Sequence, residues 1–232
     1  MGERFEVVIQ KSTDTTRVII ETDDNLFDVI HFSVTDKVLH FSTSKEIVKK
    51  KRLRITVFVS EQFNAIYVKE KGKVTIDDEM VFDNLVVDAS EKSEIELNLQ
   101  VKNSLNVEAT DKAELVINGN AKTTKIHLSE SAEIKGDFSA LNMDIVLNDH
   151  GYTKFEGTTK QLKLTANKKA EVKCRNFKVS DAVVKVFDKS SIEINVSGNL
   201  SLIATGSSST EIYGNPKINL KRFKDNATLY KK

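Results

Sequence analysis

Apolar residues along this chain follow two superimposed intervals. Over short distances they alternate with polar residues, which is the pattern of a β-strand with one buried face. Over longer distances, a phrase of two such segments separated by a three-residue polar corner returns about every 20 residues. One copy reads Leu85-x-Val87-x-Ala89, three polar residues, and Ser93-x-Ile95-x-Leu97, and seven further copies align with it. The chain therefore carries an internal repeat.

Two columns of the aligned repeat show how each copy is built. The second position of the first segment is apolar in every copy, at Ile66, Val87, Val107, Ile126, Leu147, Leu164, Val184 and Leu202. The position after the corner is small, at Gly72, Ser93, Ala113, Ala132, Thr153, Ala170, Ser190 and Ser208. A small inward residue lets the backbone bend sharply without crowding the interior. Each copy is thus expected to form two short strands joined by a corner, with a third stretch that returns the chain to its start.

One copy cannot bury its apolar row alone, so the copies must stack. Coils stacked ~4.8 Å apart would pair backbone to backbone and turn the second column into a continuous interior ladder. The repeat therefore predicts an all-β fold, a parallel β-helix of about eight coils with about 20 residues each. The alternative is an antiparallel sandwich or barrel, which also gives short alternating strands. It is disfavoured because Asn118-Gly119 is the one tight-hairpin signal, and because a sandwich has no reason to repeat the same columns at one spacing.

The first 60 residues do not follow the repeat, although they still alternate like strands. Strands are expected at residues 5–10, 17–21, 29–34, 38–42 and 53–59. An open solenoid end would expose unpaired strand edges, so residues 1–60 are expected to be an irregular β cap on a helix formed by residues 61–232, together one structural domain. The basic run Lys49-Lys50-Lys51-Arg52 within the cap is interpreted as a solvated turn.

Composition narrows the classes of function. The 232 residues include 35 lysines and arginines against 34 aspartates and glutamates, so the net charge of +1 gives no electrostatic basis for binding nucleic acid. No apolar run approaches the ~18 residues of a membrane-spanning helix. The lone Cys174 cannot form an intrachain disulfide and is interpreted as a small buried hydrophobe. The chain begins with a strand-like segment and not with the charged and apolar regions of a signal peptide. If the natural protein is exported, we expect that its signal peptide has been removed and that Met1-Gly2 is a cloning remnant.

Candidate catalytic and metal-binding residues do not converge in the repeat. The four histidines fall in different strands, at His31, His40, His127 and His150. His127 and His150 are one coil apart and could be neighbours, but both are expected at the surface, whereas zinc needs three or four ligands at close reach. Cys174 lies in an inward column without a histidine in register, and no Gly-x-Ser-x-Gly nucleophile elbow is present. We therefore expect no catalytic residue, no metal ligand and no cofactor.

Outward carboxylates recur, as they do in polysaccharide-cleaving β-helices. The repeat places Asp88 beside Glu108 on one face, and Glu96, Glu156, Glu193 and Glu211 on another. Lysines are interspersed with them, at Lys125, Lys163, Lys173 and Lys185. This mixture is typical of a solvated face with ion pairs between coils. Asp149 is the one acid predicted in an inward column, and a corner residue that accepts hydrogen bonds is the simpler interpretation of it. The absence of tryptophan weakens the case for a sugar-stacking groove.

The segment Gly198–Pro216 reads GNLSLIATGSSSTEIYGNP. It resembles the closing phrase of the head GIN domain family, known as auto-transporter adhesins of unknown function. Asp24-Asn25-Leu26-Phe27-Asp28 resembles the family's N-terminal part, and the resemblance covers nearly the whole chain, although Glu, Lys, Asp and Thr replace the family's Ser-Gly-Ser-Gly corners in the middle coils. It implies a right-handed parallel β-helix, export to the cell envelope of Bacteroides-like bacteria, and no established catalytic residues.

These observations favour a non-enzymatic cell-envelope protein, an adhesin or structural module located in the periplasm, at the outer membrane or on the cell surface. Its partner would be a macromolecule at the cell surface, protein or glycan and not nucleic acid, and it could form homo-oligomers. One alternative is a polysaccharide-active enzyme, whose turnover would be lost in Asp88→Ala or Asp149→Ala. The other is a scaffold that polymerises end to end, as bactofilin-like β-helices do, which the N-terminal cap would block.

Overall fold

A computed structural model of the chain describes residues 5–12, 15–44, 53–60 and 62–232. The run Lys49–Arg52 and the opening Met1-Gly2 lie outside the described residues, so the expectations about them stay predictions. In the described part, the only helical element is the single-turn η1 (Asp24–Leu26), and no helix is long and apolar enough to cross a membrane. The predicted all-β fold class is confirmed.

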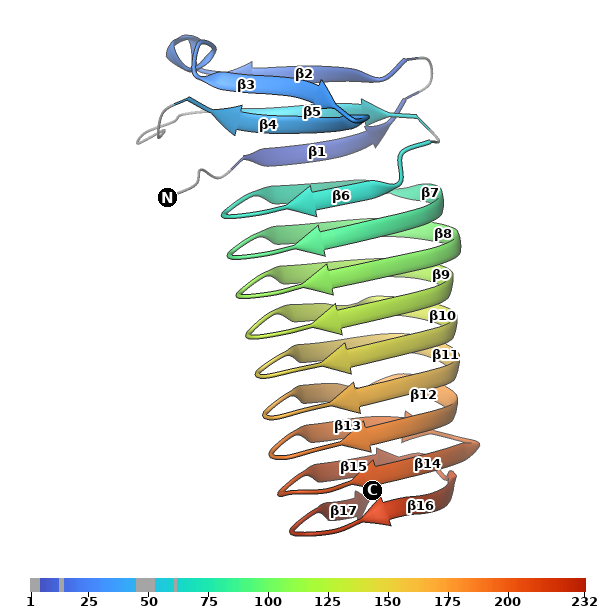
Figure 1. Cartoon of the computed structure of the whole chain (residues 1–232). Coiled ribbons are helices and arrows are strands. Elements are labelled where there is room, and N and C mark those ends of the chain that lie inside the picture. The colour runs from blue at the N-terminus through green and yellow to red at the C-terminus, as the bar shows by residue number, and fades with distance from the viewer. Residues whose placement is uncertain (1–4, 13–14, 45–52, 61) are drawn as a thin grey trace.

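Parallel coils stack along one axis from Ala65 to the C-terminal end of the chain (Figure 1). The first coils consist of β6 (Ala65–Val68), β7 (Lys73–Ala89), β8 (Glu94–Ala109), β9 (Glu114–Leu128), β10 (Glu133–Leu147), β11 (Tyr152–Ala166) and β12 (Glu171–Val186). Each of these strands pairs in parallel with the next. The result is a right-handed β-solenoid of about nine turns, which confirms the predicted parallel β-helix and excludes the antiparallel sandwich.

The C-terminal coils are built from shorter strands. These strands are β13 (Ser191–Val196), β14 (Asn199–Ala204), β15 (Ser209–Tyr213), β16 (Lys217–Phe223) and β17 (Thr228–Lys231). β14 pairs with β12 and β16, whereas β15 pairs with β13 and β17, so the same two columns of strands continue. The last coil, β16 with β17, has no counterpart among the eight copies aligned from the sequence.

Each coil has two long faces, a sharp corner and a rounded bend. β8 shows the plan, because its first half lies on one face and its second half, after the bend, lies on the other. The corners follow the second face, and Figure 1 shows them stacked along one edge of the molecule with the bends stacked along the opposite edge. The predicted third stretch is therefore the bend, where the strand curves without ending in β7–β12.

Inward side chains form one continuous apolar core that extends from Ile9 in the N-terminal strands to Ile212 near the C-terminus. The registers correct one part of the predicted second column. Ile145, and not Leu147, pairs with Ile126 and Leu164. The second column of the fifth copy therefore lies two residues earlier in the chain than the sequence alignment predicts. The small position after that corner is accordingly Gly151 rather than Thr153, which pairs instead with Ile134. The other seven members of the second column are in register and buried.

The N-terminal strands match the predicted ranges to within one residue at each end. They are β1 (Glu6–Lys11), β2 (Arg17–Thr22), β3 (Ile30–Thr35), β4 (Val38–Thr43) and β5 (Leu53–Val59). β1 pairs in parallel with β7 and β5, so it extends the solenoid ladder, while β2 closes that edge in an antiparallel pair with β5. β3 and β4 form a separate hairpin. These strands lie over the first coil as expected of a cap (Figure 1), whereas the division into segments at residue 60 stays a prediction.

Candidate functional site

The residues considered for catalysis are not brought together. Within the described ranges, no group of three or more His, Cys, Asp or Glu side chains is arranged to hold a metal ion. Cys174 is a buried thiol, and burial raises its pKa to about 12, which keeps it protonated at neutral pH. Ser208 is buried in the small column beside its corner, where no histidine is in register with it. Neither Cys174 nor Ser208 is therefore exposed as a nucleophile in the described structure.

The histidines are separated as the sequence suggested. His31 and His40 lie on the exposed β3–β4 hairpin. His127 is exposed on the outer face, where its Nε2 lies 3.0 Å from the side-chain nitrogen of Asn148. His150 is an exposed corner residue of the next coil. The position beside His127 in that coil is Val146, so the two histidines do not share a row.

The outward carboxylates occupy rows of mixed charge. Asp88 and Glu108 are in register, as predicted, and so are Glu193 and Glu211. Glu156 does not belong to the row of Glu96; it pairs with Asp137, because the alignment error in the fifth copy moved it by two residues. Ion pairs between coils occur on these surfaces, for example Lys73 Nζ to Glu96 Oε1 at 2.6 Å, as expected of a solvated face.

Asp149 is a corner residue and not an inward one, which corrects the prediction that its column faces the core. Its φ is 58°, and its carboxylate accepts a hydrogen bond from Lys168 of the next corner at 2.5 Å. That hydrogen bond and the positive charge of Lys168 lower the pKa of the Asp149 carboxyl. Asp88 lies on a flat face of an earlier coil, so the two carboxylates proposed for polysaccharide cleavage lie in different coils and different columns.

The corners form a ladder with an unusual backbone. In every corner the middle residue lies in the left-handed region, with φ between 56° and 63° except at Gly206, where φ is 76°. These residues are Glu70, Glu91, Asp111, Glu130, Asp149, Lys168, Asp188, Gly206 and Asp225. Left-handed φ costs a non-glycine residue about 1 kcal/mol. The next residue's amide donates to the carbonyl of the corner before it, for example Lys92 to Glu70 at 2.8 Å, so consecutive corners are held at one fixed spacing.

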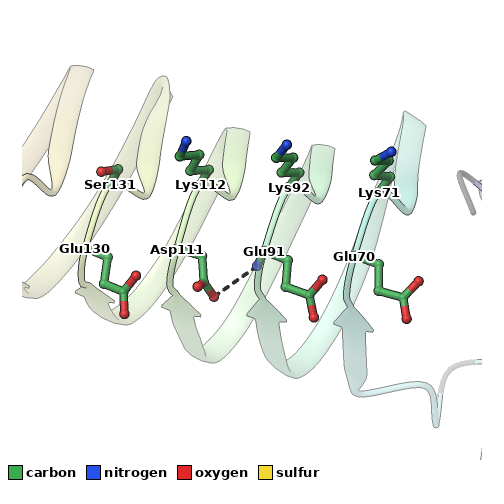
Figure 2. Close-up of a pocket in the computed structure, with 8 residues that line it drawn as sticks. All are labelled: Glu70, Lys71, Glu91, Lys92, Asp111, Lys112, Glu130 and Ser131. Carbon is green, nitrogen blue, oxygen red and sulfur yellow. Dashed lines mark hydrogen bonds between the residues drawn. The ribbon is translucent and has the colours of Figure 1, made fainter. Parts of the chain in front are cut away.

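Two rows of opposite charge follow from that ladder over the first four corners. The middle residues Glu70, Glu91, Asp111 and Glu130 form a row of carboxylates, and Lys71, Lys92 and Lys112 form a parallel row of ammonium groups that ends at Ser131. Figure 2 shows the carboxylates on one side of the corner edge and the lysines on the other. The eight side chains line an open groove of about 380 Å³, which we call the corner groove.

The charges of the corner groove do not neutralise one another. Among the described residues, no ion pair within 4.0 Å joins any of these seven charged side chains to another. The carboxylate of Asp111 instead accepts hydrogen bonds from the backbone amide of Glu91 at 3.1 Å and from the hydroxyl of Thr110 at 2.9 Å. Beyond Ser131 the pattern breaks, because Lys168 occupies the middle position and pairs with Asp149.

A second groove lies along the opposite edge, over the bends of β9–β13. Its volume is about 430 Å³, and we call it the bend groove. Its lining includes the residues of one outward row, Asn120, Ser139, Thr158 and Lys178, which are in register across four coils. Small or buried side chains line its floor, namely Ala121, Ala140, Thr159 and Val179. The remaining lining residues are Leu141, Lys160, Ser180 and Ser197.

The chemistry of the bend groove is that of hydroxyl and amide groups with two positive charges. Ser139 Oγ lies 3.3 Å from both the amide nitrogen and the hydroxyl of Thr158, so neighbouring coils share hydrogen bonds along the row. Lys160 and Lys178 are exposed, and in the described part of the chain neither makes an ion pair. No aromatic ring lines the groove. It can bind an extended molecule by hydrogen bonds and charge, but not by stacking on sugar rings.

Sequence reasoning missed both grooves. The acidic and basic rows of the corner groove were present in the aligned corners, but they were interpreted only as polar turn residues. The bend groove was missed because the aligned phrase covers the two short segments and the corner but not the bend, although Asn120, Ser139 and Thr158 follow one another there without a register shift.

Comparison with known proteins agrees with this architecture. A family model described as "Putative auto-transporter adhesin, head GIN domain" matches residues 1–138 and 123–216. The chain belongs to this head GIN domain family. The phrase Gly198–Pro216 that carried the resemblance forms the turns and strands of the late coils, with Gly206 and Gly214 at positive φ of 76° and 81°. No curated protein matches the chain.

Solved structures of other proteins share the fold. A protein from Parabacteroides merdae described as a "putative adhesin" is 14% identical, with a TM-score of 0.70 over 99% of this chain and 88% of that one. A "putative adhesin" from Parabacteroides distasonis is 17% identical, with a TM-score of 0.66 over 100% and 88%. A "putative lipid binding protein" from the same species is 15% identical, with a TM-score of 0.70 over 98% and 90%. At these identities the likeness shows the fold alone.

Proposed function

We propose that this head GIN domain is a non-enzymatic binding module of the cell envelope that holds an extended acidic glycan along its bend groove. The observation that carries the proposal is the groove itself, which crosses several coils and repeats hydroxyl and amide groups at one coil spacing beside Lys160 and Lys178. The family's adhesin label supports a binding role in the envelope over catalysis.

The class of ligand follows from the lining. A polymer that spans several coils can use each rung in turn, because the rungs lie ~4.8 Å apart. Hydroxyl and amide side chains both donate and accept hydrogen bonds, which suits a polyhydroxylated chain. Neutral sugars usually need an aromatic platform, which the groove lacks. Carboxylate or sulfate groups on the glycan would instead interact with the two exposed lysines, whose charges are not neutralised by neighbours.

The test is binding to an array of acidic and neutral glycans, followed by titration of each hit by calorimetry. The double variant Lys160→Gln/Lys178→Gln should bind an acidic glycan at least about tenfold more weakly, the effect of losing two charge-assisted contacts. The matched control is Lys125→Gln/Lys163→Gln, which removes the same charge from an exposed row of the flat face and should bind like the wild type.

Three outcomes would contradict the proposal. Failure of the wild type to bind any acidic glycan, or equal weakening by both double variants, would remove the bend groove as the site. Release of new reducing ends from any glycan, lost in Asp88→Ala or Asp149→Ala, would establish the enzyme alternative instead. Fractionation of cells that express the natural gene would test the envelope location separately.

A further inference from the structure

The corner groove lies on the edge opposite the bend groove and has a different chemistry. Its carboxylate row and its ammonium row both run parallel to the solenoid axis, as Figure 2 shows for the four corners. Seven of its eight lining residues are exposed, and Asp111 is half-buried. The two rows remain separate, so each is available to a partner with the opposite charges at the same spacing.

We propose that the corner groove is a self-association surface, at which two copies of this chain pair side by side and parallel. A rotation of 180° about an axis parallel to the solenoid places the carboxylate row of one copy opposite the ammonium row of the other. The perpendicular two-fold axis in the plane of the contact would place carboxylates opposite carboxylates. The charges therefore select the parallel arrangement as well as the partner.

The spacing of the rows favours a second copy over an unrelated partner. The rows of two copies have the same spacing, because the hydrogen bonds between successive corners set it in both. Three coils supply both an acid and a lysine, at Glu70–Lys71, Glu91–Lys92 and Asp111–Lys112. Each of these coils adds two ion pairs across the two-fold axis. A single exposed ion pair is weak, so the association depends on the rows acting together and on low salt.

The first test is sedimentation of the purified full chain at several concentrations and salt levels. The wild type should form a dimer whose dissociation constant rises about tenfold or more between about 50 mM and about 500 mM sodium chloride, because salt screens exposed charges. Retention of the monomer at all concentrations in low salt would overturn the proposal. A dimer that is insensitive to salt would also overturn it.

Charge-swap variants test the surface itself. The all-acid variant Lys71→Glu/Lys92→Glu/Lys112→Glu and the all-base variant Glu70→Lys/Glu91→Lys/Asp111→Lys should each be monomeric, and an equimolar mixture should restore a dimer. Lysine is compatible with the left-handed corner position, because Lys168 occupies it with a φ of 63°. The matched control Lys125→Glu/Lys163→Glu/Lys185→Glu makes the same change in net charge on the flat face and should remain dimeric. Dimeric swap variants, or a mixture that stays monomeric, would refute the surface.

The orientation has its own readout. In the parallel arrangement, Ser131 lies opposite Glu130 of the second copy, so an equimolar mixture of the Ser131→Cys and Glu130→Cys variants should give a disulfide-linked dimer under mild oxidation. Cys174 is buried and does not compete. Far-UV circular dichroism establishes that each variant retains its β-structure. A non-covalent dimer without this cross-link would exclude the parallel arrangement.

Discussion

Three phenylalanine rings stack inside the middle of the solenoid, and the central one offers a quantitative test of the core. The ring of Phe155 lies 6.5 Å from that of Phe138 and 6.1 Å from that of Phe177, centroid to centroid, and all three side chains are at most 1% exposed. Gly157 pairs with both Phe138 and Phe177, and a Cβ there would lie 2.3 Å from the Phe138 carbonyl oxygen. The strands that carry Phe138 and Gly157 are already in close contact here, so they cannot move together to fill a cavity left at Phe155.

Phe155→Ala should therefore destabilise the protein by about 4 kcal/mol. Burial of a phenylalanine side chain contributes roughly 2–3 kcal/mol, and the cavity left in a core that cannot collapse raises the usual loss to about 3–5 kcal/mol. The two ring pairs, worth about 1 kcal/mol each, move the expectation to the middle of that range or above. This loss is a large part of the roughly 5–15 kcal/mol that stabilises a typical domain.

Urea unfolding followed by far-UV circular dichroism measures this loss as a change in the free energy of unfolding. Phe155→Leu keeps most of the volume and should cost about 1 kcal/mol. Phe32→Ala truncates a ring that is 58% exposed and should cost less than about 1 kcal/mol. A loss below about 1.5 kcal/mol for Phe155→Ala would show that the rings do not pack as the structure has them, because a cavity of this size cannot cost so little in a rigid core.

Three further changes test the corners by the same unfolding measurement. The buried hydroxyl of Ser190 has no hydrogen-bond partner in the described structure, so Ser190→Ala should stabilise by about 1 kcal/mol, and Ala132→Ser in the same column should destabilise. Glu130→Gly should stabilise by about 1 kcal/mol by relieving its left-handed φ of 56°, whereas Glu130→Ala should gain nothing. Lys168 lowers the pKa of the Asp149 carboxyl in the folded protein. The carboxylate therefore stabilises the fold above its unfolded-state pKa, and this contribution is lost as the pH falls through the lowered folded-state pKa. Asp149→Asn should accordingly flatten the decline in melting temperature between about pH 5 and about pH 2.

The sequence was sufficient to predict the solenoid because its columns report burial directly. Ile66, Val107 and Val184 are apolar because each faces the same interior, and the registers place them in one row. The N-terminal strands were equally predictable from alternation alone. Their partners were not, because alternation shows which face is buried but not which strand lies beside it.

The misplacement of Asp149 has a physical explanation. A shift of two residues keeps every side chain on its original face, so the alternation of Ile145, Leu147 and Asp149 fits two registers equally well. Only the corner distinguishes them, since each corner has three residues and a small residue after it. Both Gly151 and Thr153 follow three residues, but the corner before Gly151, Asn148-Asp149-His150, is polar throughout like the other corners, whereas His150-Gly151-Tyr152 before Thr153 is not. Alignment on the corners would have placed Asp149 beside Lys168 and revealed the acidic row at the same time.

The bends could not be predicted in this way because they absorb the differences in coil length. The register shifts between Val101 and Ser104 at the bend, and again between Cys174 and Lys178 in the residues that lead into the bend. The corners keep one length throughout, so their side chains form regular rows along the whole solenoid, whereas the bend residues keep one spacing only across β9–β11. The same property gives the two edges different chemistry, a regular charged ladder on one and a groove of variable lining on the other.

Pairing through the corners would leave both bend grooves on the outer edges of the dimer, because corner and bend lie on opposite sides of every coil. The two-fold axis parallel to the solenoid would make both grooves run in the same direction. A surface carrying many copies of one glycan could then engage both grooves at once, and the second contact would form at a high effective concentration. Weak binding at each groove would thereby give firm attachment of the dimer to the surface. Salt that separates the two copies would weaken this attachment more than it weakens glycan binding at a single groove. Comparison of the all-acid monomer with the wild type on a glycan-coated surface and with soluble glycan separates these two effects: the variant should lose affinity for the surface while it retains that for the soluble chain.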